Sequence, residues 1–265
     1  MIPIVGRVVK RIRASNLAFR LEDALLGRLA DRDADRARRL AAPPANAAMK
    51  SEAEIEAARA LLRRLGLRYK FDHPSKVWDG VRFLSFLLHR VEPGEPVLDF
   101  GCGVHANVLR WLELYGYRRL WAIDTLFARP VRRGAIFYSG DDVHRTRFAD
   151  GRFAAAICQS VVEHGVELPR FFAEARRVIR PGGYLLLSTD YWPEKVDTDG
   201  ETMYGLRWTI FSRREIDELR ETARRAGFTP AGEVDGDVAD PVLRLRDRGY
   251  TFIFLAFQRE SDGIS

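Results

Sequence analysis

The chain has few of the residues that build metal centres or disulfide frameworks. Its 265 residues include two cysteines, Cys102 and Cys158, and five histidines, and no two histidines have the i, i+4 spacing of a helical metal site. Two cysteines give no disulfide framework, which favours a reducing, cytoplasmic compartment. The segment DTDG, residues 197–200, resembles the start of a calcium loop but lacks the later glutamate that completes one. We therefore expect no metal.

Long apolar runs and several catalytic motifs are also absent. No run approaches the roughly 20 apolar residues that span a bilayer. The opening MIPIVG is too short for a secretory signal and lacks its basic flank. The sequence contains no P-loop and no G-x-S-x-G nucleophile elbow. With 46% apolar and 30% charged residues, the composition is typical of a soluble globular protein.

The net charge of +6 comes from the first 50 residues. They hold eleven Lys or Arg against five Asp or Glu, so residues 51–265 balance to zero. Such a basic arm can bind nucleic acid or an anionic membrane surface. In DRDADRARRL, residues 31–40, the charges alternate in sign and no aromatic residue is interleaved. This pattern favours a solvated helix face over either partner.

A break of small residues and prolines, residues 41–50, separates an N-terminal arm from the rest of the chain. Ser51 and Glu54 have the spacing of a capping box, which predicts a helix that ends at Gly66. A second helix is expected over VWDGVRFLSFLLHR. The expected domains are an N-terminal helical extension over 1–90, with a basic arm over 1–50, and one larger domain over 91–265.

In the larger domain, apolar strands alternate with helices, the pattern of a mostly parallel α/β sheet. No helix fits between the last two strands, so they are expected to be neighbours, with the final strand antiparallel. The seven expected strands are 97–100, 120–123, 135–138, 153–158, 184–189, 228–234 and 250–258, with helices over 106–115, 168–179 and 212–226.

The stretch VLDFGCGVHAN, residues 97–107, places Gly101 and Gly103 directly after a strand. Glycine lets the backbone pass close to a ligand, and the following helix offers unpaired N–H groups. With Ala106 the two glycines also satisfy the dinucleotide fingerprint G-x-G-x-x-G/A. Asp99 argues against a dinucleotide, because its carboxylate would repel a pyrophosphate. It suits a ligand with an ammonium and a sulfonium, such as the methionine end of S-adenosylmethionine.

At these residues the sequence resembles the class I S-adenosylmethionine-dependent methyltransferases, over roughly residues 70–260. LWAID resembles the family's second strand, whose terminal acid, Asp124, would bind the ribose hydroxyls. GDDVHRTRFADGRF resembles the segment in which an acid meets the adenine amine, and the spacing from Phe148 selects Asp142 over Asp141. AAAICQSVVEHG resembles the fourth strand and its loop, and FFAEARRVIRPGGYLLLST the next helix, turn and strand.

The resemblance implies a Rossmann-like fold and S-adenosylmethionine as the cofactor. The cofactor-binding residues that it implies are Asp99, Gly101, Cys102, Gly103, Asp124, Asp142 and Gln159. Two positions depart from the family pattern. His105 stands where a third glycine is common, and could begin the helix and cover the methionine carboxylate or partly close the pocket. Ala154 replaces an aspartate that does not usually bind the cofactor.

Methyl transfer needs donor and acceptor held in contact, and a general base only when the acceptor is a hydroxyl or an ammonium. His164 is the candidate base, because an imidazole titrates near neutrality, although it could also pack a helix or orient the cofactor. The irregular segment 189–208 is a natural substrate lid. Its aromatic residues could wall an acceptor pocket or pack against the sheet edge: Tyr191, Trp192, Tyr204 and Trp208.

The leading hypothesis is a methyltransferase that acts on a small-molecule or glycan-like acceptor, at oxygen. A nicotinamide-dependent oxidoreductase that uses the glycine fingerprint is one alternative, which Asp99 and the antiparallel last strand oppose. A non-catalytic cofactor-binding scaffold that recruits a partner through the basic arm is another. The sequence does not identify the acceptor or the oligomeric state.

Overall fold

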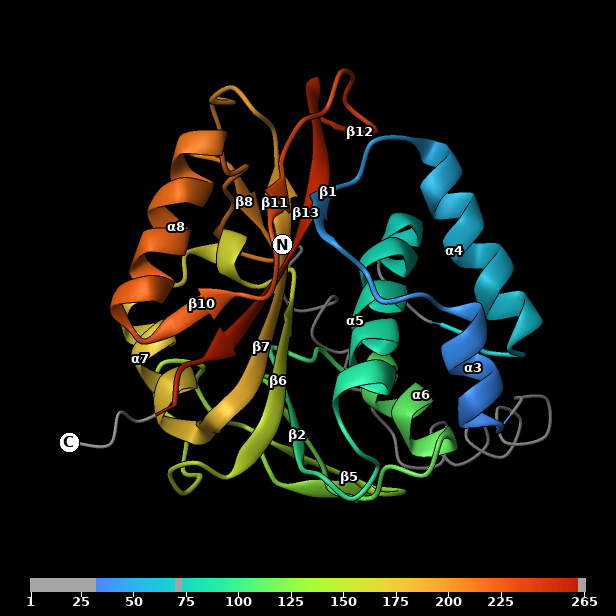
Figure 1. The fold of residues 1–265 in the computed structure, drawn as a ribbon. Helices are drawn as coiled ribbons and strands as arrows, with labels where there is room; N and C mark the ends of the chain where they lie inside the picture. The colour runs from blue at the N-terminus through green and yellow to red at the C-terminus, as the bar shows by residue number, and fades with distance from the viewer. Residues whose placement is uncertain (1–31, 70–72, 262–265) are drawn as a thin grey trace.

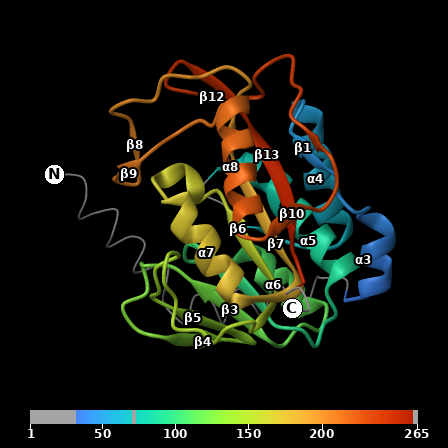
Figure 2. The same ribbon diagram turned by 60° about the vertical axis from the view of Figure 1, so that its left-hand side comes forward.

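A large mixed β-sheet forms the centre of the molecule, with helices on both faces (Figure 1). The computed structural model describes residues 32–69 and 73–261, so most of the expected basic arm lies outside the described residues. Helices α3 (Ala34–Leu40), α4 (Glu52–Arg64), α5 (Val77–Arg90) and α6 (Asn107–Leu114) lie on one side. Helices α7 (Leu168–Val178) and α8 (Arg213–Arg225) lie on the other (Figures 1 and 2). Within these described ranges, no helix has the length and apolar character needed to cross a membrane.

The main sheet has the order β11-β1-β13-β7-β6-β2-β3-β5-β4, and β10 and β12 also pair with β13. The five strands from β7 to β5 run parallel, whereas β13 pairs antiparallel with β7, as the sequence predicts. The strands that match the seven expected are β2 (Val97–Phe100), β3 (Leu120–Ile123), β5 (Ile136–Ser139), β6 (Phe153–Gln159), β7 (Ile179–Tyr191), β10 (Phe228–Pro230) and β13 (Arg248–Arg259).

Within residues 32–69 and 73–261 the sheet has eleven strands, more than the seven expected. The expected strand over 228–234 divides into β10 and the start of β11. The additional strands have two or three residues each, too short to give a period in the sequence. They are β1 (Asn46–Ala48), β4 (Val131–Arg133), β11 (Val234–Asp235) and β12 (Leu243–Leu245). Strands β8 (Thr202–Met203) and β9 (Leu206–Arg207) form a separate hairpin beyond the main sheet (Figure 2).

Of the two capping boxes that the sequence predicts, the structure forms one. At α8 the Ser212 hydroxyl accepts the backbone N–H of Glu215 and the Glu215 carboxylate accepts the N–H of Ser212, the predicted capping box. At α4, Ser51 makes no such side-chain bond, so the capping box predicted there is wrong. The Glu54 carboxylate instead accepts hydrogen bonds from the Lys50 N–H and from the Trp78 indole, at 2.8 Å each. This links α4 to α5.

The N-terminal extension is tied to the sheet itself. Strand β1 pairs antiparallel with β13 and parallel with β11. The Asn46 carboxamide accepts the backbone N–H of Ala256 at 2.7 Å. Helix α5 packs against the same strand through Phe83, whose ring meets Phe254 edge-on at 5.4 Å between centroids. A short 3-10 turn, η1 (Pro74–Lys76), leads into α5 and brings Lys76 over the carboxyl ends of the central strands.

Candidate functional site

The glycine turn after β2 is built around two backbone conformations that favour glycine. Gly101 and Gly103 have φ angles of 69° and 59°. A Cβ at Gly101 would lie 2.5 Å from Val161 Cγ2, so this part of the turn packs directly on the loop after β6. At Gly103 a Cβ would meet no atom of the described residues within 4 Å. The turn is therefore packed on one side and open beside Gly103.

The helix that follows starts later than expected. α6 begins at Asn107, because Ala106 has a left-handed backbone with φ 44°. His105 thus lies in the turn and does not begin the helix. Its carbonyl accepts the Tyr138 hydroxyl at 3.4 Å. Cys102 is half-buried and its thiol donates to the Gly103 carbonyl at 3.1 Å, so it belongs to the turn as expected.

Asp124 follows β3 directly and bonds to the glycine turn. Its Oδ2 accepts the backbone N–H of Gly103 and its Oδ1 that of Leu126, both at 2.9 Å. Asp99 lies buried beneath the turn. Burial, and then the negative charge of Asp124, raise the pKa of Asp99 well above its usual value. Two carboxyl groups thus meet at one edge of the sheet, where a bound cation would relieve their repulsion.

At the end of β5, two consecutive aspartates have different surroundings. Asp141 is buried, where it accepts the Ser139 hydroxyl at 2.6 Å and the Arg147 guanidinium at 2.7 Å. The Asp142 side chain is 63% exposed. In the described part of the chain, its hydrogen bonds come from the N–H and ring of His144, both to Oδ1. The backbone bond from His144 lowers the pKa of Asp142. Asp142 therefore has Oδ2 available for a ligand, whereas both carboxylate oxygens of Asp141 already accept hydrogen bonds.

The amide nitrogen of Gln159 makes its hydrogen bonds within the protein. It donates to Asp79 Oδ1 at 2.8 Å and to the Lys76 carbonyl at 3.1 Å. These bonds fix the end of β6 to η1 and α5. Ala154, the second departure from the family pattern, is a buried residue of β6 that is 3% exposed.

A group of polar side chains, which we call the acceptor-side cluster, lies at the carboxyl ends of β6 and β7. It consists of Lys76, Asp79, Ser160, Ser188 and Asp190. The Lys76 ammonium donates to the Ser160 hydroxyl and lies 3.8 Å from Asp79 Oδ2 and 3.7 Å from Asp190 Oδ1. Asp79 is fully buried and accepts the Ser188 hydroxyl at 2.8 Å. Burial raises the pKa of Asp79.

Sequence reasoning did not single out this cluster. Its members come from η1, α5 and the ends of two strands, so only the tertiary structure brings them together. The one local signal is the spacing of Lys76 and Asp79, three residues apart on the first turn of α5. Asp190 also lies at the carboxyl end of the buried strand β7, the position at which open α/β sheets bind ligands.

Glu163 and His164 border the acceptor-side cluster. Glu163 is 1% exposed and accepts the Thr189 hydroxyl at 3.2 Å. Burial, with the nearby charge of Asp190, raises the pKa of Glu163 to about 8. Burial lowers the pKa of His164. His164 Nδ1 is buried and makes no hydrogen bond to any residue that the structure describes.

The raised pKa of Glu163 predicts a pH-dependent stability. Between about pH 5 and 8 this carboxyl is protonated in the folded protein and ionised in the unfolded chain. The unfolded state then binds fewer protons, so stability falls as pH rises, by up to about 1.4 kcal/mol per pH unit. Glu163→Gln keeps an oxygen for Thr189 and cannot ionise. The free energy of unfolding of Glu163→Gln should therefore rise relative to the wild type from pH 5 to pH 8.

Urea unfolding at pH 5, 6.5 and 8 measures this difference. Glu233→Gln, a change at an exposed glutamate, is the matched control and should follow the wild-type curve at each pH. A constant offset between Glu163→Gln and the wild type at all three pH values would contradict the protonated, buried state of Glu163.

The four aromatic residues that could wall an acceptor pocket or pack against the sheet edge have different surroundings. Tyr191 is 1% exposed and donates to the Gly236 carbonyl at 2.9 Å, so it packs the sheet edge. Trp208 is fully buried and donates from Nε1 to Asp190 Oδ2 at 2.7 Å. Trp192 is only half-buried and packs against the core. Tyr204 is 60% exposed and its ring meets His164 edge-on at 5.8 Å.

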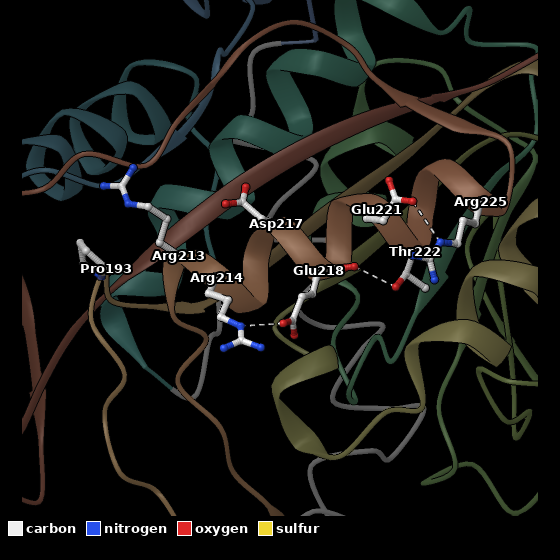
Figure 3. A pocket seen from close by; sticks show the side chains of 8 residues that line it. All are labelled: Pro193, Arg213, Arg214, Asp217, Glu218, Glu221, Thr222 and Arg225. Atoms are coloured by element: carbon white, nitrogen blue, oxygen red, sulfur yellow. Dashed lines mark hydrogen bonds and ion pairs between the residues drawn. The ribbon is translucent and has the colours of Figure 1, made fainter.

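A surface hollow of about 630 Å³ lies along α8 (Figure 3). Its charged side chains pair with one another, as Arg214 does with Glu218 at 2.9 Å and Arg225 with Glu221 at 3.0 Å. No residue of the glycine turn or of the acceptor-side cluster lines it. The hollow is a solvated helix face, and the polar groups at the carboxyl ends of the strands are the better candidate site. The residues that line the hollow are Pro193, Arg213, Arg214, Asp217, Glu218, Glu221, Thr222 and Arg225.

Comparison with known proteins connects this site to a family. A family model described as a methyltransferase domain matches residues 68–231. The chain is 34% identical over 101 residues to malonyl-acyl-carrier protein O-methyltransferase of Serratia marcescens, a match to 37% of this chain and 39% of that protein. It is 31% identical over 108 residues, 38% of this chain, to 31% of an uncharacterized transposon protein of Streptomyces fradiae. The matches thus span well under half the length of these curated relatives.

Two solved structures share the fold. Geranyl diphosphate methyltransferase in complex with S-adenosylmethionine aligns with 82% of this chain and 99% of its own, with a TM-score of 0.54 and 17% identity. The geranyl diphosphate C-methyltransferase of Streptomyces coelicolor A3(2), solved with magnesium, geranyl diphosphate and S-adenosylhomocysteine, aligns with 87% of this chain and 88% of its own, with a TM-score of 0.52 and 18% identity. At 17% and 18% identity, these two comparisons show a shared fold and nothing about the reaction.

Proposed function

Because this chain belongs to the methyltransferase family, we propose that it is an enzyme that transfers a methyl group from S-adenosylmethionine to an oxygen of a small-molecule acceptor. The observation that carries the proposal is the set of carboxyl groups around an open glycine turn. Asp99, Asp124 and Asp142 follow or end three neighbouring parallel strands, and Gly103 leaves open space beside Asp124. Such an edge suits a ligand with positive charge and hydroxyl groups.

The residues present fit the cofactor. When bound, S-adenosylmethionine supplies a methyl group activated by its positively charged sulfur. Asp99 and the backbone of Gly101 and Gly103 would hold its methionine end, with Cys102 beside them in the turn. Asp124 would accept the ribose hydroxyls and Asp142 the adenine amine. Burial disfavours the ionised form of the Asp99 carboxyl, and a cationic ligand beside it would stabilise that form.

Two observations support oxygen as the acceptor atom. One is the similarity to the O-methyltransferase of Serratia marcescens, and the other is a histidine nitrogen with no hydrogen-bond partner among the described residues. His164 Nδ1 is buried next to the acceptor-side cluster, where it can accept a proton from a hydroxyl. The glycan-like acceptor loses support, because Tyr191 and Trp208 are buried and offer no face to a sugar ring. A small hydroxylated molecule is the better fit.

The oxidoreductase alternative does not agree with the family model. The scaffold alternative makes a distinct prediction, since a scaffold binds the cofactor without consuming it. The test incubates the full-length protein with methyl-labelled S-adenosylmethionine and small-molecule extract. We expect acceptor-dependent S-adenosylhomocysteine and a product heavier by one methylene, found by untargeted mass spectrometry. Cofactor binding with no consumption in any extract fraction would favour the scaffold.

A further inference from the structure

Lys76 presents hydrogen-bond donors that the described protein groups leave unused. An ammonium has three N–H donors. Among the described residues, only the Ser160 hydroxyl is within hydrogen-bond distance of Lys76 Nζ. Asp79 and Asp190 lie at 3.8 and 3.7 Å, close enough to hold the charge but too far for an N–H···O bond. Nζ also lies 3.4 Å from the centre of the Phe252 ring, which fixes its position.

His164 presents the complementary group. Its Nδ1 is buried and has no hydrogen-bond partner among the described residues. Burial lowers the pKa of His164, which favours the neutral ring, and a neutral imidazole keeps a lone pair on one of its two nitrogens. The assignment made below gives that lone pair to Nδ1.

Lys76 and His164 belong to one site beside the glycine turn. Lys76 rests on Ser160, and the N–H of His164 donates to Val161 in the same loop at 3.0 Å. The charges of Lys76 and Asp190 both act on His164. Val161 in turn packs against Gly101, where a Cβ would lie 2.5 Å from its Cγ2. Lys76 and His164 thus both bond to the loop after β6, which packs against the glycine turn.

We propose that Lys76 Nζ and His164 Nδ1 together bind the hydroxyl group that receives the methyl, with Asp79 and Asp190 positioning the ammonium. This assignment rests on the proposed function and narrows its acceptor to a hydroxylated molecule. The hydroxyl oxygen accepts an N–H of Lys76 while its hydrogen is donated to His164. A hydroxyl is the simple group that satisfies both at once.

Other acceptor groups fit less well for reasons of charge and lone pairs. A carboxylate has no hydrogen for Nδ1, and its negative charge would meet Asp190 Oδ1, which lies 3.7 Å from the ammonium. An amine nitrogen has one lone pair, so a hydrogen bond from Lys76 would occupy the electrons needed for attack. An oxygen has two lone pairs and can accept that bond while it attacks.

In this arrangement every bond, electron pair and proton of the methyl transfer is accounted for. The O–CH3 bond forms as the S–CH3 bond breaks, the electron pair of the broken bond stays on sulfur, and the hydroxyl proton passes to His164 Nδ1. Lys76 stabilises the negative charge that develops on the oxygen, and Asp190 stabilises the imidazolium. His164 and Lys76 are the catalytic residues in this assignment.

The test measures binding of 4-nitrophenol, 4-nitroaniline and 4-nitrobenzoate to protein saturated with S-adenosylhomocysteine. We expect the phenol to bind at least about tenfold more tightly than the other two. His164→Gln keeps a polar group at the far end of the side chain but removes the acceptor at the position of Nδ1, and should weaken phenol binding about tenfold. His164→Asn replaces that acceptor and should restore binding to within about threefold.

Lys76 is tested with a charge-balanced variant, because Lys76→Met alone leaves two buried carboxylates without a counter-charge. Lys76→Met/Asp190→Asn should lose about tenfold in phenol affinity and keep its affinity for S-adenosylhomocysteine. Lys50→Met, which removes a surface ion pair with Asp235, should change neither. If the phenol shows no preference over the other probes, or binds the variants as tightly as the wild type, the assignment is overturned. Loss of S-adenosylhomocysteine binding by the wild type would instead reject the proposed function.

Discussion

Asp124→Ala is expected to weaken S-adenosylmethionine binding by at least about 100-fold. The carboxylate would accept the ribose hydroxyls, and hydrogen bonds to a charged group are worth about 1.5–3 kcal/mol each. It also accepts the N–H of Gly103 at 2.9 Å, so its loss loosens the glycine turn. Two such bonds correspond to a factor of roughly 100 or more in the dissociation constant. Isothermal titration calorimetry measures the affinity, and circular dichroism checks the fold.

Two further aspartate variants test whether the loss of affinity is specific to Asp124. Asp142→Ala removes the group expected at the adenine amine and should cost about tenfold. Asp240→Ala, at an exposed aspartate away from the strand ends, should leave the affinity unchanged. If Asp124→Ala binds the cofactor within twofold of the wild type, Asp124 is not the ribose-binding acid.

Gly140→Ala is expected to destabilise the protein by about 3 kcal/mol, an overpacking cost at the upper end of the usual range. A Cβ at this position would lie 2.0 Å from the backbone oxygen of Phe127, which cannot rotate away as a side chain can. The Phe127 N–H donates to the Asp124 carbonyl at 3.1 Å, so any shift of this loop also moves Asp124. Stability and cofactor affinity should therefore fall together. Urea unfolding and calorimetry measure the two effects.

Gly94→Ala is the control for Gly140→Ala. In the described part of the chain, a Cβ at Gly94 would meet nothing within 4 Å, so this variant should match the wild type within about 0.5 kcal/mol. Equal stability of Gly140→Ala and Gly94→Ala would mean that the loops after β3 and β5 are not packed as described.

The sequence predicts the fold correctly where a helix or strand is long enough for its apolar residues to form a clear pattern. The apolar segment at β6 and the capping box at Ser212 are both present, and the last strand is antiparallel. The two-residue and three-residue edge strands carry no period, so they were missed. The capping box at Ser51 failed because Glu54 bonds to Trp78, a residue of another helix.

The residues proposed for the cofactor side can be chosen from the sequence because they sit in contiguous motifs. Asp99, Gly101 and Gly103 lie within five residues of one another, and Asp124 follows the next strand. The acceptor-side cluster joins η1, α5 and the ends of β6 and β7, and apart from the spacing of Lys76 and Asp79 no local pattern predicts that these elements meet. The hydrogen bonds of Gln159, Tyr191 and Trp208 also join residues far apart in the chain, which a local pattern does not predict.

The pairing of β1 with β13 has a consequence for biosynthesis. Ala47 and Ala48 are register partners of Phe254 and Ile253, some 200 residues later in the chain. On a ribosome, β1 emerges long before the strand that it needs, so this edge of the sheet stays unpaired until β13 has been made. The central parallel strands, which are made earlier, can assemble before this edge closes.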